Sequence, residues 1–284
     1  MNLVASQPDT TTSRLAEAVT RRVGLRPADA LRKVASSLAC VEETCRFAYV
    51  ERMIAASPSD RDWIEFVERM LVHETYFFRH TAQVDLLRDD ILPRLDADRR
   101  NEGRSVLTVW IAGCSTGEEA WTVAFLAREA HRGRAFGEVV PVSILATDLS
   151  EASVAAARQG IYHRLHGLDS FRAIPPWAAP YFAPGWDDSR AWVVPETLRA
   201  SVHFMRHNVL DPPPVFGADL VICRNLLIYF DDTANRRAQE NLVSALRPGG
   251  VLVLGPADMP RATGALDAIG TDWATAYLKK AVVP

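Results

Sequence analysis

The stretch WIAGCSTGEEAW at residues 110–121 decides the fold, because it reads as a buried strand that turns directly into a helix. The apolar run ends at Gly113, and a loop of small residues leads to a helix that begins near Glu118. Glycine at such a turn lets a ligand approach the backbone, and the first turn of a helix offers free N–H groups. This unit is typical of doubly wound α/β folds, whose ligands bind at the carboxyl ends of the strands.

Short runs rich in Val, Ile and Leu alternate with helical patterns over the rest of this part of the chain. Such runs are typical of strands that helices cover on both faces. The alternation predicts a mostly parallel, doubly wound sheet. The predicted strands are VLTVWIAG (106–113), VSILATD (142–148), SVHFMRHN (201–208), ADLVICRN (218–225) and GVLVLG (250–255). The predicted helices lie at 117–130, 150–159 and 233–246.

The N-terminal part of the chain predicts an all-α domain over residues 1–72, of which 1–13 form a polar, disordered lead. Apolar residues at i, i+3, i+4, i+7 and i+8 indicate one helix face. These residues are Trp63, Phe66, Val67, Met70 and Leu71. Residues 73–99 are predicted to be a linker that contributes to the ligand site, and 100–284 to form the sheet domain.

One stretch interrupts the alternation of strands and helices. Residues 165–204 contain five prolines, several aromatic residues and a predicted turn at Pro184-Gly185-Trp186-Asp187, followed by the strand-like AWVV. This pattern predicts a small inserted subdomain with an antiparallel β-hairpin.

Composition excludes some classes of function. The 284 residues include 32 basic and 35 acidic side chains, a formal net charge of −3, which argues against a general nucleic-acid binder. No apolar run is long enough for a transmembrane helix, and the first residues lack a signal-peptide pattern. A cytoplasmic location is therefore expected. The four cysteines show no CxxC pair, which fits reduced thiols better than a disulfide framework.

Two carboxylates follow neighbouring predicted strands. Glu118 opens the helix after the first strand, and Asp148 ends the second, where an acid is the usual partner of a ribose diol. Because the glycines do not match GxGxxG and acids stand where a pyrophosphate would bind, a dinucleotide is disfavoured. The pair favours a nucleoside without a diphosphate, with S-adenosylmethionine as the candidate. Two alternatives stay open: Glu118 can merely complement the helix dipole, and Asp148 can merely cap a helix.

Further candidates lie near the same predicted sheet edge. CRNLLIYFDD (223–232) brings Arg224, Asn225 and Tyr229 there, although its apolar residues can simply pack. Asn208 follows a strand, where its amide can read an adenine edge. Arg79 lies among aromatic residues in HETYFFRH (73–80), and a guanidinium in an apolar setting needs an anionic partner. No metal site is expected, because His203 and His207 lie in or beside a predicted strand and lack a third ligand.

Together these segments resemble the CheR family of chemoreceptor methyltransferases. The matching motifs are His73 to Arg79 (N-E-T-x-F-F-R in the family), Ala112 to Glu119 (A-x-C-S-T-G-E-E), Asp148, Asn208-Val209 (Asn-Leu), and Cys223 to Asp231 (C-R-N-x-x-I-Y-F-D). The resemblance runs over residues 63–255. Here His73 replaces the usual Asn, and Gly255-Pro256-Ala257-Asp258 stands where the family often has Gly-His-Ser-Glu.

The resemblance implies a Rossmann-like class I methyltransferase fold and transfer of a methyl group from S-adenosylmethionine to glutamate carboxylates. The acceptor would be the cytoplasmic domain of a methyl-accepting chemoreceptor, with no metal, nucleic acid or membrane insertion involved. Arg79 and Tyr229 would lie nearest the methyl group. The implied cofactor residues are His73, Thr75, Arg79, Ala112, Gly113, Glu118, Asp148, Asn208, Val209, Arg224 and Asn225. A different acceptor, or a non-catalytic module that binds the cofactor or its demethylated product, stays open.

A basic segment near the N-terminus is a candidate partner surface. Residues 14–33 hold six basic and two acidic side chains, and this charge can steer an acidic receptor helix. A solvated face without a partner explains the charge equally well.

Overall fold

The computed structural model describes residues 10–130, 140–163, 170–182, 191–261, 263–271 and 274–281. Two compact units divide the chain, and each is described by itself. We call residues 1–72 with 229–237 the helical unit, and residues 73–228 with 238–284 the sheet unit. None of the helices in the described part of the chain combines the length and apolar character that a membrane crossing needs.

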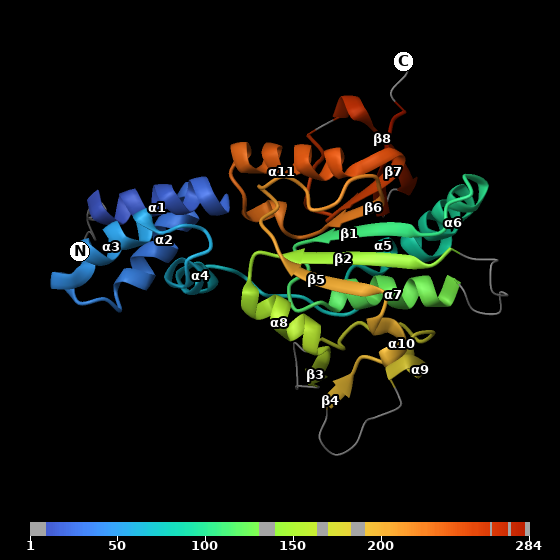
Figure 1. The fold of residues 1–284 in the computed structure, drawn as a ribbon, viewed down its shortest axis with the longest axis horizontal. Coiled ribbons are helices and arrows are strands. Elements are labelled where there is room, and N and C mark those ends of the chain that lie inside the picture. Colours follow the sequence, from blue (N-terminus) through green and yellow to red (C-terminus); the bar gives the residue numbers. More distant parts are fainter. Residues whose placement is uncertain are drawn as a thin grey trace, which may run out of the picture. The chain divides into compact units, whose positions relative to one another are not determined.

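Four helices build the N-terminal part of the helical unit (Figure 1). They are α1 (Thr10–Val23), α2 (Pro27–Leu38), α3 (Glu43–Ala55) and α4 (Arg61–Glu68). The expectation of a disordered lead up to residue 13 is wrong from Thr10 onward, because α1 begins there and residues 11–13 are already partly buried. Residues 1–9 lie outside the described residues.

The predicted helix around Trp63 is shorter than its apolar pattern. Trp63, Phe66 and Val67 are buried on α4, but the helix ends at Glu68. Met70 is buried from the turn that follows, whereas Leu71 is only partly buried and outside the helix. The helical spacing therefore identified four core residues and placed the helix end too late.

The sheet unit contains the predicted doubly wound sheet, which confirms the fold class. Its seven strands run in the order β5-β2-β1-β6-β7-β9-β8, and the pairs from β5 to β7 are parallel. The strands are β1 (Leu107–Ala112), β2 (Val142–Asp148), β5 (Val202–Arg206), β6 (Ala218–Cys223), β7 (Leu246–Leu254), β8 (Leu266–Thr271) and β9 (Ala274–Lys279). Figure 1 shows β5, β2, β1 and β6 following one another across the sheet.

The register brings the strand ends to one edge. Ala112 lies opposite Thr147 in β2, and Ile111 lies opposite Ile222 in β6. The residues that follow β1, β2 and β6 therefore start from the same edge of the sheet. Helices α7 (Glu118–Ala130) and α8 (Glu151–Gln159) begin there and pack against β2 and β5.

The C-terminal part adds two antiparallel strands that the sequence pattern did not reveal. β9 pairs with β7 and β8, both antiparallel. Helix α11 (Asp232–Ala245) ends close to the predicted position, but β7 begins at Leu246, ahead of the predicted start at Gly250. A register shift between Ala218 and Leu220 in β6 lies opposite this early part of β7, which carries Pro248 and Gly249. A short 3-10 turn, η3 (Thr263–Ala265), precedes β8.

Residues 73–99 are not a plain linker. Most of them form α5 (Thr81–Leu86), the π-helical turn η1 (Leu87–Ile91) and the start of α6 (Leu92–Asn101). Apolar residues spaced along these helices are buried in the core of the sheet unit, and this stripe was missed in the sequence. They are Val84, Leu87, Ile91, Leu92 and Leu95.

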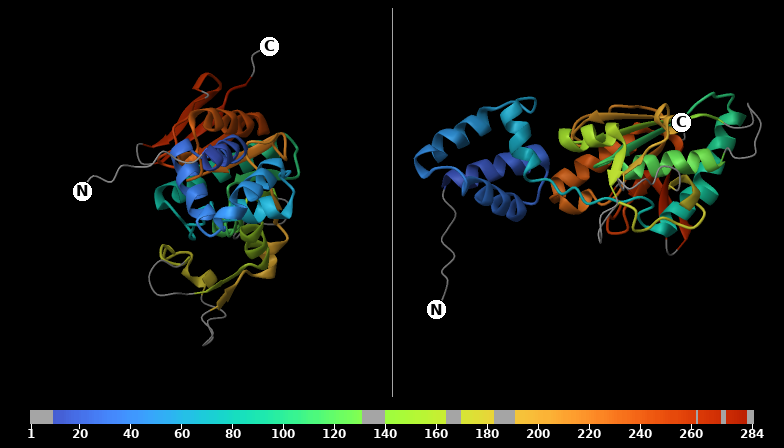
Figure 2. Two further views of the ribbon diagram at one scale, coloured as in Figure 1. Left: turned by 90° about the vertical axis from the view of Figure 1, so that its left-hand side faces the viewer. Right: turned by 90° about the horizontal axis from the view of Figure 1, so that it is seen from below.

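The predicted antiparallel insertion is confirmed, with shifted limits. β3 (Ile161–His163) pairs with β4 (Ala191–Val193) in a two-stranded ribbon, so the insertion begins before residue 165. It ends before β5, which belongs to the main sheet. Short helices α9 (Ala179–Phe182) and α10 (Glu196–Arg199) complete it, and the predicted turn at 184–187 lies outside the described residues. Figures 1 and 2 show the ribbon on the β5 side of the sheet unit.

Candidate active site

The loop after β1 is fixed to the end of β2 by backbone hydrogen bonds. The N–H groups of Gly113 and Cys114 both donate to the carbonyl of Thr147, at 2.8 and 2.9 Å. The next N–H, of Ser115, donates to Oδ2 of Asp148 at 2.8 Å. Asp148 therefore orders the loop that leads to Glu118.

Two glycines make the loop possible. Gly113 has a φ of +80°, and a Cβ there would lie 2.9 Å from Cδ2 of Leu226. Gly117 has a φ of +96°, and its Cβ would lie 2.8 Å from the Cβ of Ala157. Both positions combine a left-handed backbone with close packing, so each favours glycine for two separate reasons.

Glu118 is a buried carboxylate at the start of α7, with only 2% of the residue exposed. Its Oε1 accepts a hydrogen bond from the hydroxyl of Ser170 at 2.6 Å, and its Oε2 accepts one from Thr116 at 2.7 Å. Burial raises the pKa of Glu118, although the two hydroxyl donors oppose that shift. A carboxylate that only complemented the helix dipole would need neither of these two hydroxyl donors.

Asp148 does not act as the helix cap that the sequence left open. Ser150 caps α8, since its hydroxyl accepts from the N–H of Ser153 at 2.9 Å. The two Asp148 oxygens accept from backbone N–H groups of Ser115 and Ser150, at 2.8 and 2.9 Å. A carboxylate can accept about four hydrogen bonds, which suits an acid at this strand end to a ligand diol.

Arg224 is buried at the end of β6 and is held by protein groups. Its Nε pairs with Glu119, and its Nη1 donates to the carbonyl of Arg79 at 2.7 Å and to Oε1 of Gln83 at 3.2 Å. These contacts connect three segments that are distant in sequence. Arg224 therefore supports the site's framework, whatever direct contact it makes with a ligand.

Arg79 retains donor capacity. Its Nη1 donates to the carbonyl of Glu74 at 2.8 Å, and its guanidinium lies 5.5 Å from the ring centre of Tyr76. Its Nε is buried without a hydrogen-bond partner among the described residues. The same segment brings in His73, whose Nδ1 lies 2.9 Å from the hydroxyl of Ser153, and the partly buried Thr75.

Asn225 occupies a left-handed turn after β6, with a φ of +58°. Its N–H donates to Oδ2 of Asp258 at 3.1 Å, and its side-chain oxygen lies 3.2 Å from Nε2 of His80. Burial, followed by the nearby charge of Arg224, lowers the pKa of His80, so the ring is neutral at pH 7 and can donate from Nε2. Asp258 is the last residue of Gly255-Pro256-Ala257-Asp258, and it is an acid like the Glu that the family often has there.

The remaining predicted residues lie in different places. Ala112 ends β1 and is buried. Asn208 follows β5, where its Oδ1 accepts from the N–H of Leu210 at 3.1 Å, and the Val209 carbonyl accepts from Asn241 at 2.9 Å. Tyr229 belongs to the helical unit, at the end of the 3-10 turn η2 (Leu227–Tyr229), and its carbonyl accepts from the N–H of Arg26 at 3.1 Å. Its expected place beside the methyl group stays a prediction.

Three features of this edge fit S-adenosylmethionine. The unpartnered buried Nε of Arg79 can donate to an anionic group such as the cofactor's carboxylate. Two ordered carboxylates, Glu118 and Asp148, can accept from ammonium or hydroxyl groups. Gly113 and Gly117 allow the left-handed turns of the loop that leads from the strand end to Glu118.

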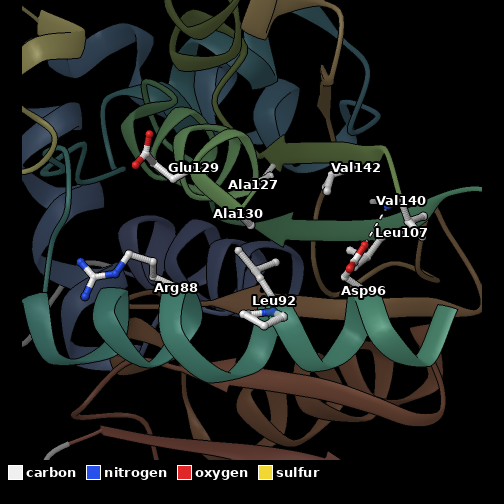
Figure 3. A pocket seen from close by; sticks show the side chains of 10 residues that line it. Arg88, Leu92, Asp96, Leu107, Ala127, Glu129, Ala130, Val140 and Val142 are labelled. Atoms are coloured by element: carbon white, nitrogen blue, oxygen red, sulfur yellow. Dashed lines mark hydrogen bonds between the residues drawn. The ribbon is translucent and has the colours of Figure 1, made fainter. Parts of the chain in front are cut away.

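A pocket of about 250 Å³ lies elsewhere, beside the starts of β1 and β2 (Figure 3). Two of its polar side chains are already engaged: Asp96 accepts from the N–H of Val140 at 2.7 Å, and Arg88 pairs with Asp85 and Asp89. Because it lies at the opposite ends of the strands from Glu118 and Asp148, it is not the candidate site.

Sequence reasoning missed several supporting residues. Ser170 and Gln83 carry no motif and reach the site only through the tertiary fold. His80 lies inside HETYFFRH but was given no role. Asp258 follows a strand end, and this position was the available signal, as it was for Asp148.

The chain is similar to a known protein family and to named proteins over most of its length. The family described as "CheR methyltransferase, SAM binding domain" matches residues 73–275. A "Chemotaxis protein methyltransferase" of Borreliella burgdorferi is 31% identical over 238 residues, which cover 82% of this chain and 81% of that protein. "Chemotaxis protein methyltransferase 2" of Vibrio cholerae is 34% identical over 193 residues, covering 66% and 63%. The chain therefore belongs to the CheR methyltransferase family.

Proposed function

We propose that this chain transfers a methyl group from S-adenosylmethionine to glutamate side chains of a chemoreceptor or related signalling protein, forming methyl esters. The observation that carries the proposal is the ordered pair of carboxylates, Glu118 and Asp148, at neighbouring strand ends. Membership of the CheR family and relatives named as chemotaxis methyltransferases support it.

The reaction does not require the protein to remove a proton from the acceptor. When bound, the cofactor supplies an electrophilic methyl group on a sulfonium. A glutamate has a reference pKa of about 4.3, so the acceptor is already ionised at neutral pH and needs no general base. The protein's task is to align the acceptor oxygen and to exclude water, and alignment alone is worth roughly 7–11 kcal/mol in favourable intramolecular cases.

Arg79 and Tyr229 are the proposed catalytic residues. The free donor of Arg79 can orient either the acceptor carboxylate or the carboxylate of the cofactor. Tyr229 is assigned beside the sulfonium by the family resemblance. Thr75, Asn208, Val209, Asn225 and the loop from Ala112 complete the proposed cofactor site.

Hydrogen bonds within the helical unit reduce the number of basic side chains that are available to contact a receptor. Arg22 is not available, because it donates to the carbonyls of Ala56 and Ile54 at 2.9 and 2.7 Å. Lys33 likewise donates to the carbonyl of Met70. Arg21 is exposed, and we assign the contact with an acidic receptor helix to it.

Four free cysteines support the cytoplasmic location included in this proposal.

Radiolabel transfer tests the proposal. Purified protein, methyl-labelled S-adenosylmethionine and receptor-containing membranes should yield label that alkali releases as methanol. Arg79→Ala and Tyr229→Phe should each lower turnover at saturating cofactor at least tenfold, a loss of about 1.4 kcal/mol of transition-state stabilisation. Transfer only to soluble compounds would replace the acceptor, and binding without transfer would replace the enzymatic role.

A further inference from the structure

The inserted segment between β3 and β5 reaches the carboxylate of Glu118. Ser170, which lies in this segment, donates its hydroxyl to Oε1 at 2.6 Å. Thr116 donates to Oε2 at 2.7 Å, so both oxygens have one fixed donor. One of the two donors that orient this carboxylate, Ser170, therefore lies 52 residues further along the chain than Glu118.

A second contact joins the insertion to the same loop. Tyr162, in the middle of β3, donates its hydroxyl to the carbonyl of Thr116 at 2.7 Å. The residue is buried, and its hydroxyl would lie 3.1 Å from a Cβ placed on Gly117. The end of this ring thus supports the loop directly before Glu118.

The same two residues are tied to the segment that carries Arg79. The N–H of Phe77 donates to the carbonyl of Ser170 at 2.9 Å. The Phe77 ring meets the ring of Tyr162 edge to face, with centroids 5.0 Å apart. Phe77 is fully buried, so it holds Ser170 and Tyr162 against a rigid core.

We propose that Ser170 and Tyr162 are positioning residues for Glu118, so that the inserted subdomain sets the cofactor affinity of the sheet unit. This inference rests on the proposed cofactor site. A carboxylate in a buried position keeps one orientation only while its donors are in place. Loss of the Ser170 hydroxyl removes a donor to Glu118, and loss of the Tyr162 hydroxyl removes the donor to the Thr116 carbonyl in the loop before it. Either change should displace the carboxylate that we assign to the cofactor.

Binding of S-adenosylhomocysteine, measured by calorimetry, tests the role without relying on turnover. Ser170→Ala and Tyr162→Phe should each raise its Kd about tenfold at pH 8, in line with the loss of one well-oriented hydrogen bond. Ser170→Thr retains the hydroxyl and should restore the affinity. Ser201→Ala is the matched control, because this serine of the same segment donates to the carbonyl of Leu198 and not to Glu118.

The pH profile of binding separates positioning from general support of the fold. Cys114 and Tyr162 interact electrostatically with Glu118, and burial raises the pKa of both, so neither becomes charged between pH 5 and 8. The acids Asp148 and Glu119 lie near the same cluster and are unchanged in every variant compared. The Ser170 donor lowers the pKa of Glu118. In Ser170→Ala the midpoint at which affinity falls should therefore move to higher pH, whereas Ser201→Ala should leave it unchanged.

The outcomes are distinct. Unchanged Kd values and pH midpoints for Ser170→Ala and Tyr162→Phe, with a weakened Glu118→Gln, would overturn the positioning role alone. Full affinity in Glu118→Gln would overturn the proposed cofactor site and this inference with it. If Tyr162→Phe melts well below the control, Ser170→Ala and its threonine rescue decide the question.

Discussion

The buried guanidinium of Arg224 donates a hydrogen bond to the backbone carbonyl of Arg79, at 2.7 Å. It also pairs with Glu119 on α7 and contacts Gln83 on α5. Arg224 thus joins the end of β6 to the segment that carries Arg79 and to the helix that carries Glu118. The site depends on this junction, because none of these segments is adjacent in sequence.

Removing Arg224 should destabilise the sheet unit strongly. Arg224→Met leaves the carboxylate of Glu119, whose side chain is 11% exposed, without its partner. Breaking one side of a buried ion pair costs about 3–5 kcal/mol. Urea unfolding of Arg224→Met should show a loss of this size.

The double variant Arg224→Met with Glu119→Gln is the control, because it removes the unpaired charge. It should recover a measurable part of the lost free energy of unfolding. Equal destabilisation in the single and double variants would show that the ion pair is not the cause.

Cofactor affinity should weaken as the pH falls. Burial raises the pKa of Glu118 above its ordinary value, so the carboxylate takes up a proton at a higher pH than an exposed glutamate would. If the ionised form binds the cofactor, affinity is complete above this raised pKa and is lost below it. Calorimetry from pH 8 to 5 should show the loss, and Glu118→Gln should give weak, nearly pH-independent binding.

The local sequence pattern was sufficient to predict the strands and loops that carry the site. Apolar runs ending at Gly113 and Asp148 predicted two parallel strands. Because parallel strands run in the same direction, their carboxyl ends lie at the same edge of the sheet. The contribution of Ser170 could not be predicted, because a lone serine in a Pro-rich stretch has no periodicity or motif. Likewise, β8 and β9 lack a clear apolar alternation: β8 exposes most of its residues, and tertiary pairing defines both strands.

Gly117→Ala should be costly. A non-glycine residue with a positive φ costs on the order of 1 kcal/mol, and the new Cβ would also lie 2.8 Å from the Cβ of Ala157. We expect a total loss of about 2–4 kcal/mol in the free energy of unfolding, together with weaker cofactor binding.

Gly103→Ala supplies the comparison for the glycine variant. Gly103 has a φ of +66° and nothing within 4 Å of an added Cβ, so it reports backbone strain alone. A larger loss in Gly117→Ala reports the close packing of the loop on α8 together with the less favourable φ of +96°. Equal losses would mean that packing at Gly117 relaxes freely.

Asp258 should make the protein less stable as the pH rises. Its Oδ2 accepts from the N–H groups of Asn225 and Gly255, at 3.1 and 3.2 Å. Burial raises the pKa of Asp258. The folded state therefore binds this proton more tightly than the unfolded state, and the stability from this group is lost as the pH rises through the raised pKa.

Asp258→Asn tests that sign, because its amide oxygen can accept the same two N–H groups without a charge. The variant should exceed the wild type in free energy of unfolding by about 1 kcal/mol at pH 8, and the difference should shrink at pH 5. Asp267→Asn, which changes an exposed carboxylate paired with Lys280, should show no such trend. A constant difference between Asp258→Asn and the wild type across this range would mean that the carboxyl does not titrate with a raised pKa.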